Sequence, residues 1–508
     1  MTDRFLQKKK GLLSMFGGSS GDALLLTAVK LVTMLLSLVT TRLLSQYLTT
    51  YDYGTYSQVL LIASTIASIT ILGMMDGMNF FFCSEKDTER REAYVATIYL
   101  MQLALGVIMG AAVMLLTKPI CAYMDNPELK KLMLFAAILP TLQNLIYISQ
   151  VLLISVGKAK VLALRNLVIS VLKLAAIIIV VHFVKDIALI LIVSVLLDAF
   201  QLLIFYFILR KNGCLIRFTK AELRLILPIL RYCVPMAVFV MLNTLNRDCD
   251  KYVIAAFTDT ETLAVYTNAS KALPIDIVMS SFITILLPFI TRGISEKRNS
   301  ETIEVYRLFL EISYISTAVL GGCILVSAPE FVSLLYSDKY LGGLSVFCIY
   351  ILIDMVKFMS ITLLLTAAGK TRILMFISLG AILSNIGLNI LFYKLMGLIG
   401  PAIATLAVTF AAGILILYFS AKELDGRIRE LFDLRFLIKF FAVLTAAVFL
   451  FGYIRILLEK LEMNSYLILA VCSACYLTVT AFLFLKRLMR NMKRINGLSK
   501  AKEVLVNE

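Results

Sequence analysis

Long apolar runs are the feature that most constrains the fold of this chain. Residues 23–44, 57–82, 94–116 and 132–156 are near-continuous apolar segments, and about 20 helical residues cross the ~30 Å hydrocarbon core of a bilayer. Charged residues make up only 16% of the sequence, against about 25% in soluble domains. The sequence therefore predicts an all-α polytopic membrane protein, because a membrane β-barrel would show short alternating segments instead.

The apolar runs divide the chain into fourteen predicted transmembrane helices. They are 22–44, 57–82, 94–116, 132–156, 163–183, 187–209, 233–256, 264–290, 308–328, 344–368, 373–393, 398–419, 436–454 and 466–485. With the N-terminus inside, the cytoplasmic side carries 34 Lys and Arg residues and the outer side carries 8. The positive-inside rule then places both termini in the cytoplasm.

The net charge of +16 has a second reading, a nucleic-acid surface. The basic residues lie between the apolar runs, in every second connection, and no DNA- or RNA-reading motif is present. We therefore interpret the charge as topology and exclude nucleic acid as a partner. The basic segment after Lys486 is expected to contact anionic lipid headgroups of the bilayer.

Three pairs of residues recur at nearly the same offset. They are Tyr56 and Tyr266, 210 apart, Pro119 and Pro329, also 210 apart, and Gly157 and Gly369, 212 apart. This recurrence predicts a duplication of six spans. Because six is even, the two copies point the same way and their axis runs along the membrane normal.

The expected division of the chain follows this repeat. The segments are a basic cytoplasmic N-terminus (1–21), a first lobe (22–209), a cytoplasmic linker (210–232), a second lobe (233–419), two further spans (420–485) and a basic cytoplasmic tail (486–508). No connection exceeds about 25 residues, which leaves no room for a soluble catalytic domain. No nucleophile–base constellation is visible, so we expect a protein that is not an enzyme.

Cysteine and histidine usage gives no metal site. Cys472 and Cys475 form a CxxC pattern inside the last span, and His182 is the single histidine. Scattered cysteines inside apolar spans are typical of small buried side chains. Neither a metal nor a cofactor is expected.

Charged residues inside the spans are the candidate functional residues. The cations are Lys30, Arg42, Lys173, Arg247, Lys251, Lys271 and Lys357. Each charge at mid-bilayer costs roughly 2.5–3.5 kcal/mol, so most of them must face water or an acidic partner. Cations in a low-dielectric cavity favour an anion, and phosphate or diphosphate suits Arg and Lys best. We therefore predict that the seven cations bind the substrate.

The stretch LNTLNRDCDKYVIAAF, residues 242–257, concentrates these charges. Asn243, Asn246, Arg247, Asp250 and Lys251 share one helical face at i, i+3, i+4, i+7 and i+8. We interpret this stretch as a membrane helix with one wet face.

Two kinds of role stay open for the other charges. Asp354 and Lys357 are one turn apart and can simply form a pair. Lys30 and Lys173 have no acid one turn away, which favours a functional or cross-helix role. Asp76, Asp276 and Asp354 are candidates for coupling transport to H⁺ or Na⁺.

At these residues the chain resembles the oligosaccharide-lipid flippases, the polysaccharide biosynthesis or export proteins of the multidrug/oligosaccharidyl-lipid/polysaccharide exporter superfamily. The matching motifs are RLLSQYLTTYDYGTYS, LNTLNRDCDKYVIAAF, PEFVSLLYSDKY, AAGKTR and SNIGLNILFYKLMGLIGPAIATLAVT. The last block is the most specific, with Asn385, Asn389, Gly397, Gly400, Ala404 and Thr405. Arg42, Arg247 and Lys251 fall on motif positions.

The resemblance implies a V-shaped, two-lobed bundle whose first, second, seventh and eighth spans line a cationic cavity. It implies translocation of an undecaprenyl-diphosphate-linked oligosaccharide to the outer leaflet of a bacterial plasma membrane by alternating access. A polysaccharide polymerase or glycosyltransferases are implied as functional partners.

Three other functions are weighed against this one. A lipid II flippase of peptidoglycan synthesis is close in chemistry, whereas a multidrug exporter for organic cations would favour an acidic cavity. A membrane glycosyltransferase or polymerase would need a sizeable outer loop with catalytic side chains, and the longest outer loops here have about 15 residues.

Overall fold

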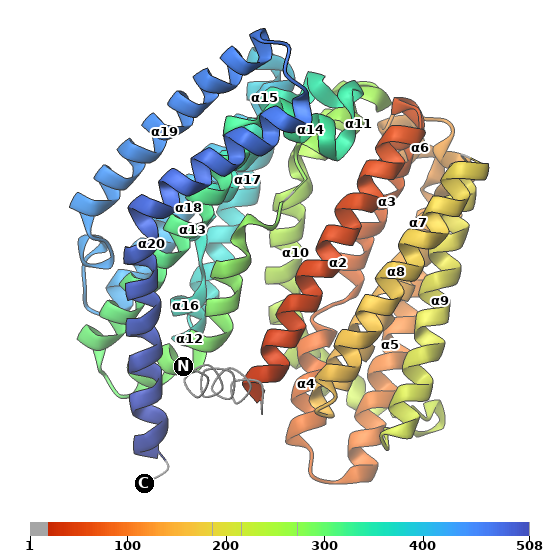
Figure 1. Cartoon of the computed structure of the whole chain (residues 1–508). Helices are drawn as coiled ribbons and strands as arrows, with labels where there is room; N and C mark the ends of the chain where they lie inside the picture. The colour runs from red at the N-terminus through yellow and green to blue at the C-terminus, as the bar shows by residue number, and fades with distance from the viewer. Residues whose placement is uncertain (1–18, 185, 215, 272, 507–508) are drawn as a thin grey trace, which may run out of the picture. The chain divides into compact units, whose positions relative to one another are not determined.

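Helices form all the regular secondary structure of the described residues. A computed structural model describes residues 19–506 apart from 185, 215 and 272, and no strand occurs in that part of the chain (Figure 1). Within the described residues, eleven helical stretches are long and apolar enough to cross a membrane. The all-α membrane class is therefore confirmed, while the count of fourteen spans and the parallel duplication stay predictions.

The correspondence with the predicted spans is close but not one to one. One of the eleven stretches, Thr371–Glu423, contains two helices that the sequence predicts as separate spans. The predicted seventh and eighth spans, 233–256 and 264–290, are not among the eleven.

The chain divides into two compact units. The first comprises Met1–Leu245 and Thr258–Ala264, and the second comprises Asn246–Phe257 and Val265–Glu508. The boundary lies inside one long helix, α10 (Ile226–Phe257), whose two parts belong to different units.

The first unit is built from the N-terminal helices. They are α2 (Ser19–Tyr47), α3 (Thr50–Thr70), α4 (Met74–Ser84), α5 (Thr88–Leu115), α6 (Thr117–Tyr123), α7 (Leu129–Ser155), α8 (Ala159–Phe183), α9 (Ile187–Lys211), the short η1 (Phe218–Lys220) and η2 (Leu223–Leu225), and the start of α10. Helix α7 packs against α3, α4, α5 and α9, and α2 packs along α8.

Polar side chains on α7 explain how it can be buried on so many sides. The Asn144 amide donates to the Ala67 carbonyl at 3.0 Å and to the Thr70 hydroxyl at 2.9 Å. The Ser149 and Tyr99 hydroxyls form a 2.6 Å hydrogen bond. Buried polar groups persist when they are hydrogen-bonded, so these contacts also fix the register of α7 against α3 and α5.

The second unit contains the C-terminal helices. They are the end of α10, α11 (Thr260–Ala269) from Val265 on, η3 (Pro274–Asp276), α12 (Ile277–Ser295), α13 (Asn299–Val326), α14 (Ala328–Tyr336), η4 (Asp338–Gly343), α15 (Leu344–Val356), η5 (Lys357–Ser360), α16 (Leu363–Ala367), α17 (Thr371–Met396), η6 (Gly397–Ile399), α18 (Gly400–Glu423), η7 (Ile428–Leu431), α19 (Leu434–Lys460) and α20 (Ser465–Val506). Helix α13 packs against α12, α15, α19 and α20.

A charged cluster joins α19 and α20 to α13. The buried Glu311 of α13 accepts hydrogen bonds from the Arg487 guanidinium, one of them at 3.1 Å, and from the Asn491 amide at 2.8 Å. Arg487 also donates to Asp433, at the start of α19, at 2.9 Å. Glu311 thus connects α13 to both α19 and α20. Loss of these contacts would leave a buried, unpaired carboxylate, which costs several kcal/mol.

A second ion pair lies near the other end of α13. Glu330 of α14 accepts from the Arg455 Nε of α19 at 2.8 Å, and Arg455 also lies 3.1 Å from Glu459. Glu330 and Arg455 are both largely buried. The two clusters therefore hold α19 at separate points along its length.

Three predicted spans are not continuous helices, which corrects the sequence analysis. The predicted span 57–82 is interrupted between Thr70 and Met74, where Gly73 has φ of +66°. The predicted span 264–290 is interrupted between Ala269 and Ile277. Pro274 lies in this interruption, and a proline lacks the N–H of a helix and disfavours helical geometry in the residue before it. The predicted span 344–368 is interrupted after η5, where the Tyr306 hydroxyl donates to the freed Ile361 carbonyl at 3.4 Å.

The most specific sequence block forms a tight hairpin between α17 and α18. Gly397 has φ of +66°, in the left-handed region that favours glycine. A Cβ atom on Gly400 would lie 2.1 Å from the Phe392 carbonyl oxygen. The glycines are therefore required by the turn itself, and Ala404 is fully buried behind it.

Two of the recurring residues lie in turns of the same kind. Gly157 and Gly369 have φ of +78° and +68°, and each follows the end of a helix. The Lys158 N–H donates to the carbonyl five residues back at 3.1 Å, and the Lys370 N–H does so at 2.9 Å. This pattern satisfies carbonyls at the end of a helix.

We predict that Glu311→Gln destabilises the protein by about 1.5–3 kcal/mol, because Arg487 loses its charged partner but retains Asp433. Thermal unfolding of the purified protein in detergent measures the effect. Glu128→Gln is the control, since its 2.8 Å pair with Lys131 is exposed and exposed ion pairs contribute little to stability. Equal effects of the two substitutions would contradict the role assigned to Glu311.

The same cluster predicts a pH dependence. The hydrogen bond from Arg487 lowers the pKa of the Asp433 carboxyl. A lowered folded-state pKa gives stability that is present above the ordinary carboxyl value of about 4 and is lost as the pH falls through the lowered value. Asp433→Asn should therefore lower the midpoint of thermal unfolding at neutral pH. It should also reduce the further fall of that midpoint below about pH 4.

Candidate functional site

The C-terminal part of α10 carries a compact ion-pair network. Asp248 is buried and accepts from the Arg247 guanidinium at 3.1 Å and from the Lys251 ammonium at 3.0 Å. The side chain of Lys251 is only 11% exposed, whereas that of Arg247 is 66% exposed. Lys251 is therefore held inside the unit by an acid one turn earlier, while Arg247 retains an accessible face.

Asp250 is the most deeply buried acid of this helix and faces two tyrosines. The Tyr266 hydroxyl of α11 donates to Asp250 Oδ2 at 2.8 Å, and the Tyr350 hydroxyl of α15 donates to the same oxygen. Asp250 is 1% exposed, and its other oxygen lies 3.8 Å from the Lys251 ammonium. Three elements of the second unit thus converge on one carboxylate.

Amide side chains extend this polar cluster toward α17 and α18. The Asn385 amide donates to the Asn246 side-chain oxygen at 3.1 Å, and the Thr405 hydroxyl donates to the Asn385 oxygen at 3.4 Å. Asn389 donates to the Cys249 sulfur at 3.6 Å. These residues are the polar members of the motif block, so the structure gives them a place beside α10.

These contacts correct the interpretation of residues 242–257 as a helix with one wet face. Asn243 and Arg247 are exposed, but Asp250 is buried and Lys251 is nearly so. The helical stripe is real in its geometry, yet its C-terminal part faces tyrosines and a carboxylate instead of water. The spacing alone could not distinguish a helix face that is exposed to water from one that packs against other polar side chains.

Four further candidate residues of the second unit lie at or near the two interruptions of its predicted spans. They are Lys271, Asp276, Asp354 and Lys357. Lys357 forms a 2.5 Å ion pair with the buried Asp354, so their pairing is confirmed. Asp276 is close enough to interact electrostatically with Asp354. Lys271 lies in the non-helical segment before Pro274 and is half-buried. Asp276 at this break therefore lies near the Asp354–Lys357 pair.

In the first unit, three predicted cations lie on helices that pack together. Lys30 is exposed on α2, Arg42 is half-buried on the same helix, and Lys173 is half-buried on α8. Lys173 is attracted by Asp198 of α9, which supports the predicted cross-helix role. Asp76 is exposed on α4.

The sequence analysis missed a buried arginine in the first unit. Arg165 of α8 is 7% exposed, donates to Gln201 of α9, and lies 4.1 Å from the centroid of the Phe205 ring. Gln201 in turn donates to Asp198 at 2.8 Å. Arg165 lies inside the predicted span 163–183 but is not among the candidate cations, and its distance of 33 residues from Asp198 gives no local signal of this cluster.

The candidate cations thus fall into two groups, those with an acid nearby and those exposed at the surface. Lys251, Lys357 and Lys173 each have an acid nearby, whereas Lys30 and Arg247 present charge at an exposed surface. Among the described residues, no group of three His, Cys, Asp or Glu side chains could hold a metal ion. The arrangement can bind an anion through accessible cations and can hold a proton or a monovalent cation at buried oxygens.

The fold is that of a membrane transporter. The chain is similar to a solved structure titled as lipid II flippase MurJ in an inward closed conformation, with a TM-score of 0.72 at 16% identity over 92% of this chain and 100% of that one. It is also similar to an inward-facing multidrug resistance MATE family transporter of the MOP superfamily, with a TM-score of 0.66 at 15% identity over 79% and 98%.

A third likeness is to a MOP superfamily transporter from Pyrococcus furiosus, with a TM-score of 0.54 at 14% identity over 80% of this chain and 94% of that chain. No curated protein sequence matches the chain. The profile of the "Polysaccharide biosynthesis protein" family matches residues 39–344. The chain belongs to this family.

We predict that Tyr266→Phe lowers the free energy of unfolding by about 1.5–3 kcal/mol, because Asp250 loses one of two hydroxyl donors. The midpoint of thermal unfolding in detergent is the measurement. Tyr393→Phe serves as the control, since its hydroxyl donates at 3.1 Å to the Phe257 carbonyl at a partly exposed site. A Tyr266→Phe protein as stable as the Tyr393→Phe protein would refute a structural role for this hydrogen bond.

Proposed function

We propose that this protein is a flippase that moves a polyprenyl-diphosphate-linked oligosaccharide from the cytoplasmic to the outer leaflet. Its family and its transporter fold support movement of a lipid-linked substrate. A diphosphate headgroup cannot cross hydrocarbon without a polar path, and alternating access provides one while the polyprenyl tail stays in lipid. The expected setting is a bacterial plasma membrane, with both termini cytoplasmic and with polysaccharide polymerases or glycosyltransferases as functional partners.

The observation that carries the proposal is the accessibility of cations within apolar helices. Lys30 forms no ion pair with a described residue, and Arg247 keeps two thirds of its side chain exposed although it contacts Asp248. Charge is retained at such positions when it has a task, since leaving it in a membrane helix without one is costly. A diphosphate matches the forked guanidinium and the ammonium group.

We assign the substrate-binding role mainly to Lys30, Arg42 and Arg247. Lys173, Lys251 and Lys357 each have an acid nearby, and Lys271 lies in the non-helical segment before Pro274. We propose that these four lysines shape the electrostatic field around the path. A multidrug exporter for organic cations fits such accessible cations poorly, because like charges repel.

We further propose that ion coupling uses Asp250. Asp354 is ion-paired to Lys357, Asp276 lies at the start of α12, and Asp76 is exposed on α4. Asp250 differs from them because two hydroxyl groups, which can rotate and can also accept hydrogen bonds, surround it. A carboxylate in such a setting can exchange H⁺ or Na⁺ as the protein changes conformation, so Asp250 joins the three earlier candidates.

The binding site is tested by complementation of a bacterium that lacks its own oligosaccharide-lipid flippase, with surface polysaccharide as the readout. Lys30→Ala and Arg247→Ala should each lower export roughly 10- to 100-fold, as expected for loss of a charge-assisted contact. Arg224→Ala, which removes an exposed arginine outside the spans, is the control at matched membrane abundance. Undiminished export in both variants would remove the proposed binding site.

The coupling residue is tested separately in proteoliposomes. Asp250→Asn keeps the size of the side chain and its two tyrosine contacts but cannot carry an exchangeable charge. Transport driven by an imposed H⁺ or Na⁺ gradient should lose its dependence on the gradient, while transport of substrate down its own gradient persists. An unchanged dependence on both ions would exclude Asp250 as the coupling site.

Lipid II remains the alternative substrate, because it carries the same diphosphate group. The likeness to the lipid II flippase concerns the fold alone at 16% identity. Rescue of a strain depleted of its peptidoglycan-precursor flippase, with no effect on surface polysaccharide, would favour lipid II over a polysaccharide repeat unit.

A further inference from the structure

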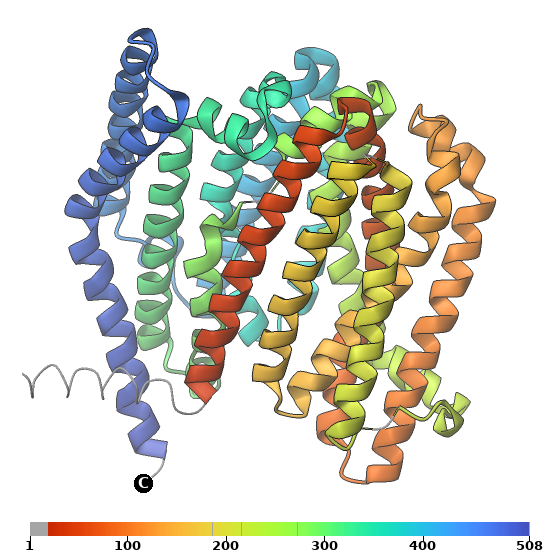
Figure 2. The same cartoon turned by 45° about the vertical axis from the view of Figure 1, so that its right-hand side comes forward.

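The last helix, α20, is much longer than a membrane crossing requires. It runs for 42 residues, which corresponds to about 63 Å at 1.5 Å per residue, twice the thickness of the hydrocarbon core. Figure 2 shows α20 as one continuous helix. Its first part is apolar through Leu485, and Lys486 begins a basic part. The change from apolar to basic therefore coincides with the expected membrane surface.

The rotation of α20 about its axis is fixed by the contacts of one face. Arg487 and Asn491 bond to Glu311, and Phe484 and Ile495 are buried. These four residues lie on the same side of the helix, as spacings of three, four and seven residues require. The opposite side must then face away from the second unit.

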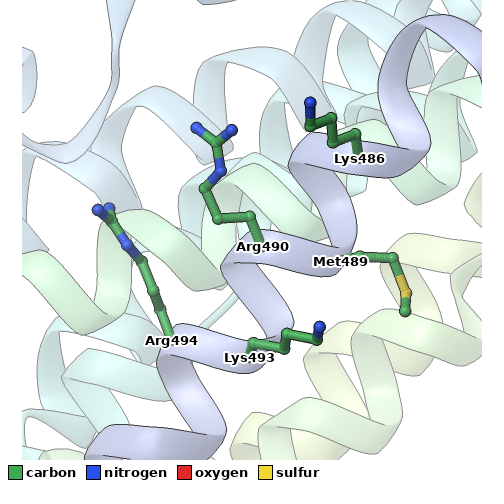
Figure 3. Close-up of a pocket in the computed structure, with 5 residues that line it drawn as sticks. All are labelled: Lys486, Met489, Arg490, Lys493 and Arg494. Carbon is green, nitrogen blue, oxygen red and sulfur yellow. The ribbon is translucent and has the colours of Figure 1, made fainter.

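Beside this contact face, α20 carries a cluster of cations around a hollow. Arg490 and Arg494 flank the contact face, three and seven residues after Arg487, whereas Lys486 and Lys493 lie on the opposite side. Lys486, Arg490, Lys493 and Arg494, together with Met489, line a hollow of about 460 Å³. Figure 3 shows Lys486, Arg490 and Arg494 extending from successive turns in the same direction. None of the four cations forms an ion pair with a described residue, and α20 contains no Asp or Glu between residues 465 and 495. No acidic side chain of this part of α20 therefore neutralises the positive charge around the hollow.

The same outward face is apolar immediately before these cations. Phe482 is 88% exposed and Leu485 is 50% exposed, and Met489 lies among the basic residues at 47%. The spacing from Phe482 to Leu485 and Met489 keeps them on one side of the helix. A soluble anion would be bound by the cations alone. An anionic phospholipid would also contact apolar side chains through its acyl chains, so the combination on α20 fits a phospholipid.

We propose that the outward face of α20 binds an anionic phospholipid. Lys486, Arg490, Lys493 and Arg494 contact the phosphate group of its head, and Phe482 and Leu485 contact its acyl chains. Juxtamembrane basic clusters attract anionic lipids, and the effect is screened by salt. This site differs from the proposed path of the transported substrate, because it lies on the outer face of a helix that follows the predicted repeat.

The test uses the purified full-length protein and dioleoylphosphatidylglycerol, with dioleoylphosphatidylcholine as the neutral comparison. Native mass spectrometry of the protein released from mixed micelles measures how much of each lipid stays bound. Substitution of all four cations by glutamine should lower retention of the anionic lipid at least 10-fold. The matched control substitutes Lys158, Arg210, Lys211 and Lys422 by glutamine, four exposed cations at the same expected side of the membrane, and should retain the lipid like wild type.

Two further measurements do not depend on the folding of the fourfold variant. Raising the salt concentration from 0.05 to 0.5 M should weaken retention of the anionic lipid by wild type. Phe482→Gln should weaken it without any change of charge. Equal retention of both lipids by wild type, or full retention by the fourfold variant, would overturn the proposal. Displacement of the lipid by glycerophosphoglycerol at equal concentration would instead identify a site for a soluble anion and would also overturn it.

Discussion

The cost of an unpaired charge in a membrane helix governs the organisation of this protein. An ion buried in hydrocarbon loses its hydration. Only an opposite charge, several hydrogen bonds or contact with water can offset this desolvation cost. Glu311, Asp354 and Asp248 are each buried acids that contact a basic side chain. The Glu311 pair joins α13 to α20, whereas Asp248 and Asp354 each pair with a cation one turn away.

The same constraint separates charges with an opposite charge nearby from charges that stay exposed. The Glu311–Arg487 pair attaches the last helix to α13, and the Asp354–Lys357 pair lies at a break in the neighbouring spans. Lys30 and Arg247 retain an exposed charge instead. A transporter of a diphosphate-linked lipid needs both kinds, because a rigid framework must hold accessible cations inside apolar surroundings.

Much of the fold could be predicted from the sequence because it follows from local composition. Apolar length gave the membrane class, and the i, i+3 spacing of Asp354 and Lys357 anticipated their ion pair. The break near Pro274 was also detectable, since the proline lies inside the predicted span. The break after Lys357 was not, because no proline or glycine marks it and its freed carbonyl is satisfied by Tyr306, 55 residues away.

The candidate site was less predictable for a related reason. The stripe on residues 242–257 lies on the helix that carries the ion-pair network, but Asp250 contacts Tyr350, which lies 100 residues later. Arg165 and Gln201 are likewise partners 36 residues apart on different helices. Periodicity reports which residues share a face and does not report what packs against it. The partner of each intramembrane charge therefore required the tertiary structure.

The most direct test of the central claim is translocation by the purified protein alone. Proteoliposomes would contain a fluorescent undecaprenyl-diphosphate-linked oligosaccharide, and the fraction accessible to a membrane-impermeant quencher would be followed over time. We predict that wild type accelerates the exchange between leaflets well beyond protein-free vesicles, and that Lys30→Ala with Arg247→Ala returns it near that baseline. Exchange no faster than in empty vesicles, together with transport of an unrelated organic cation, would contradict the account.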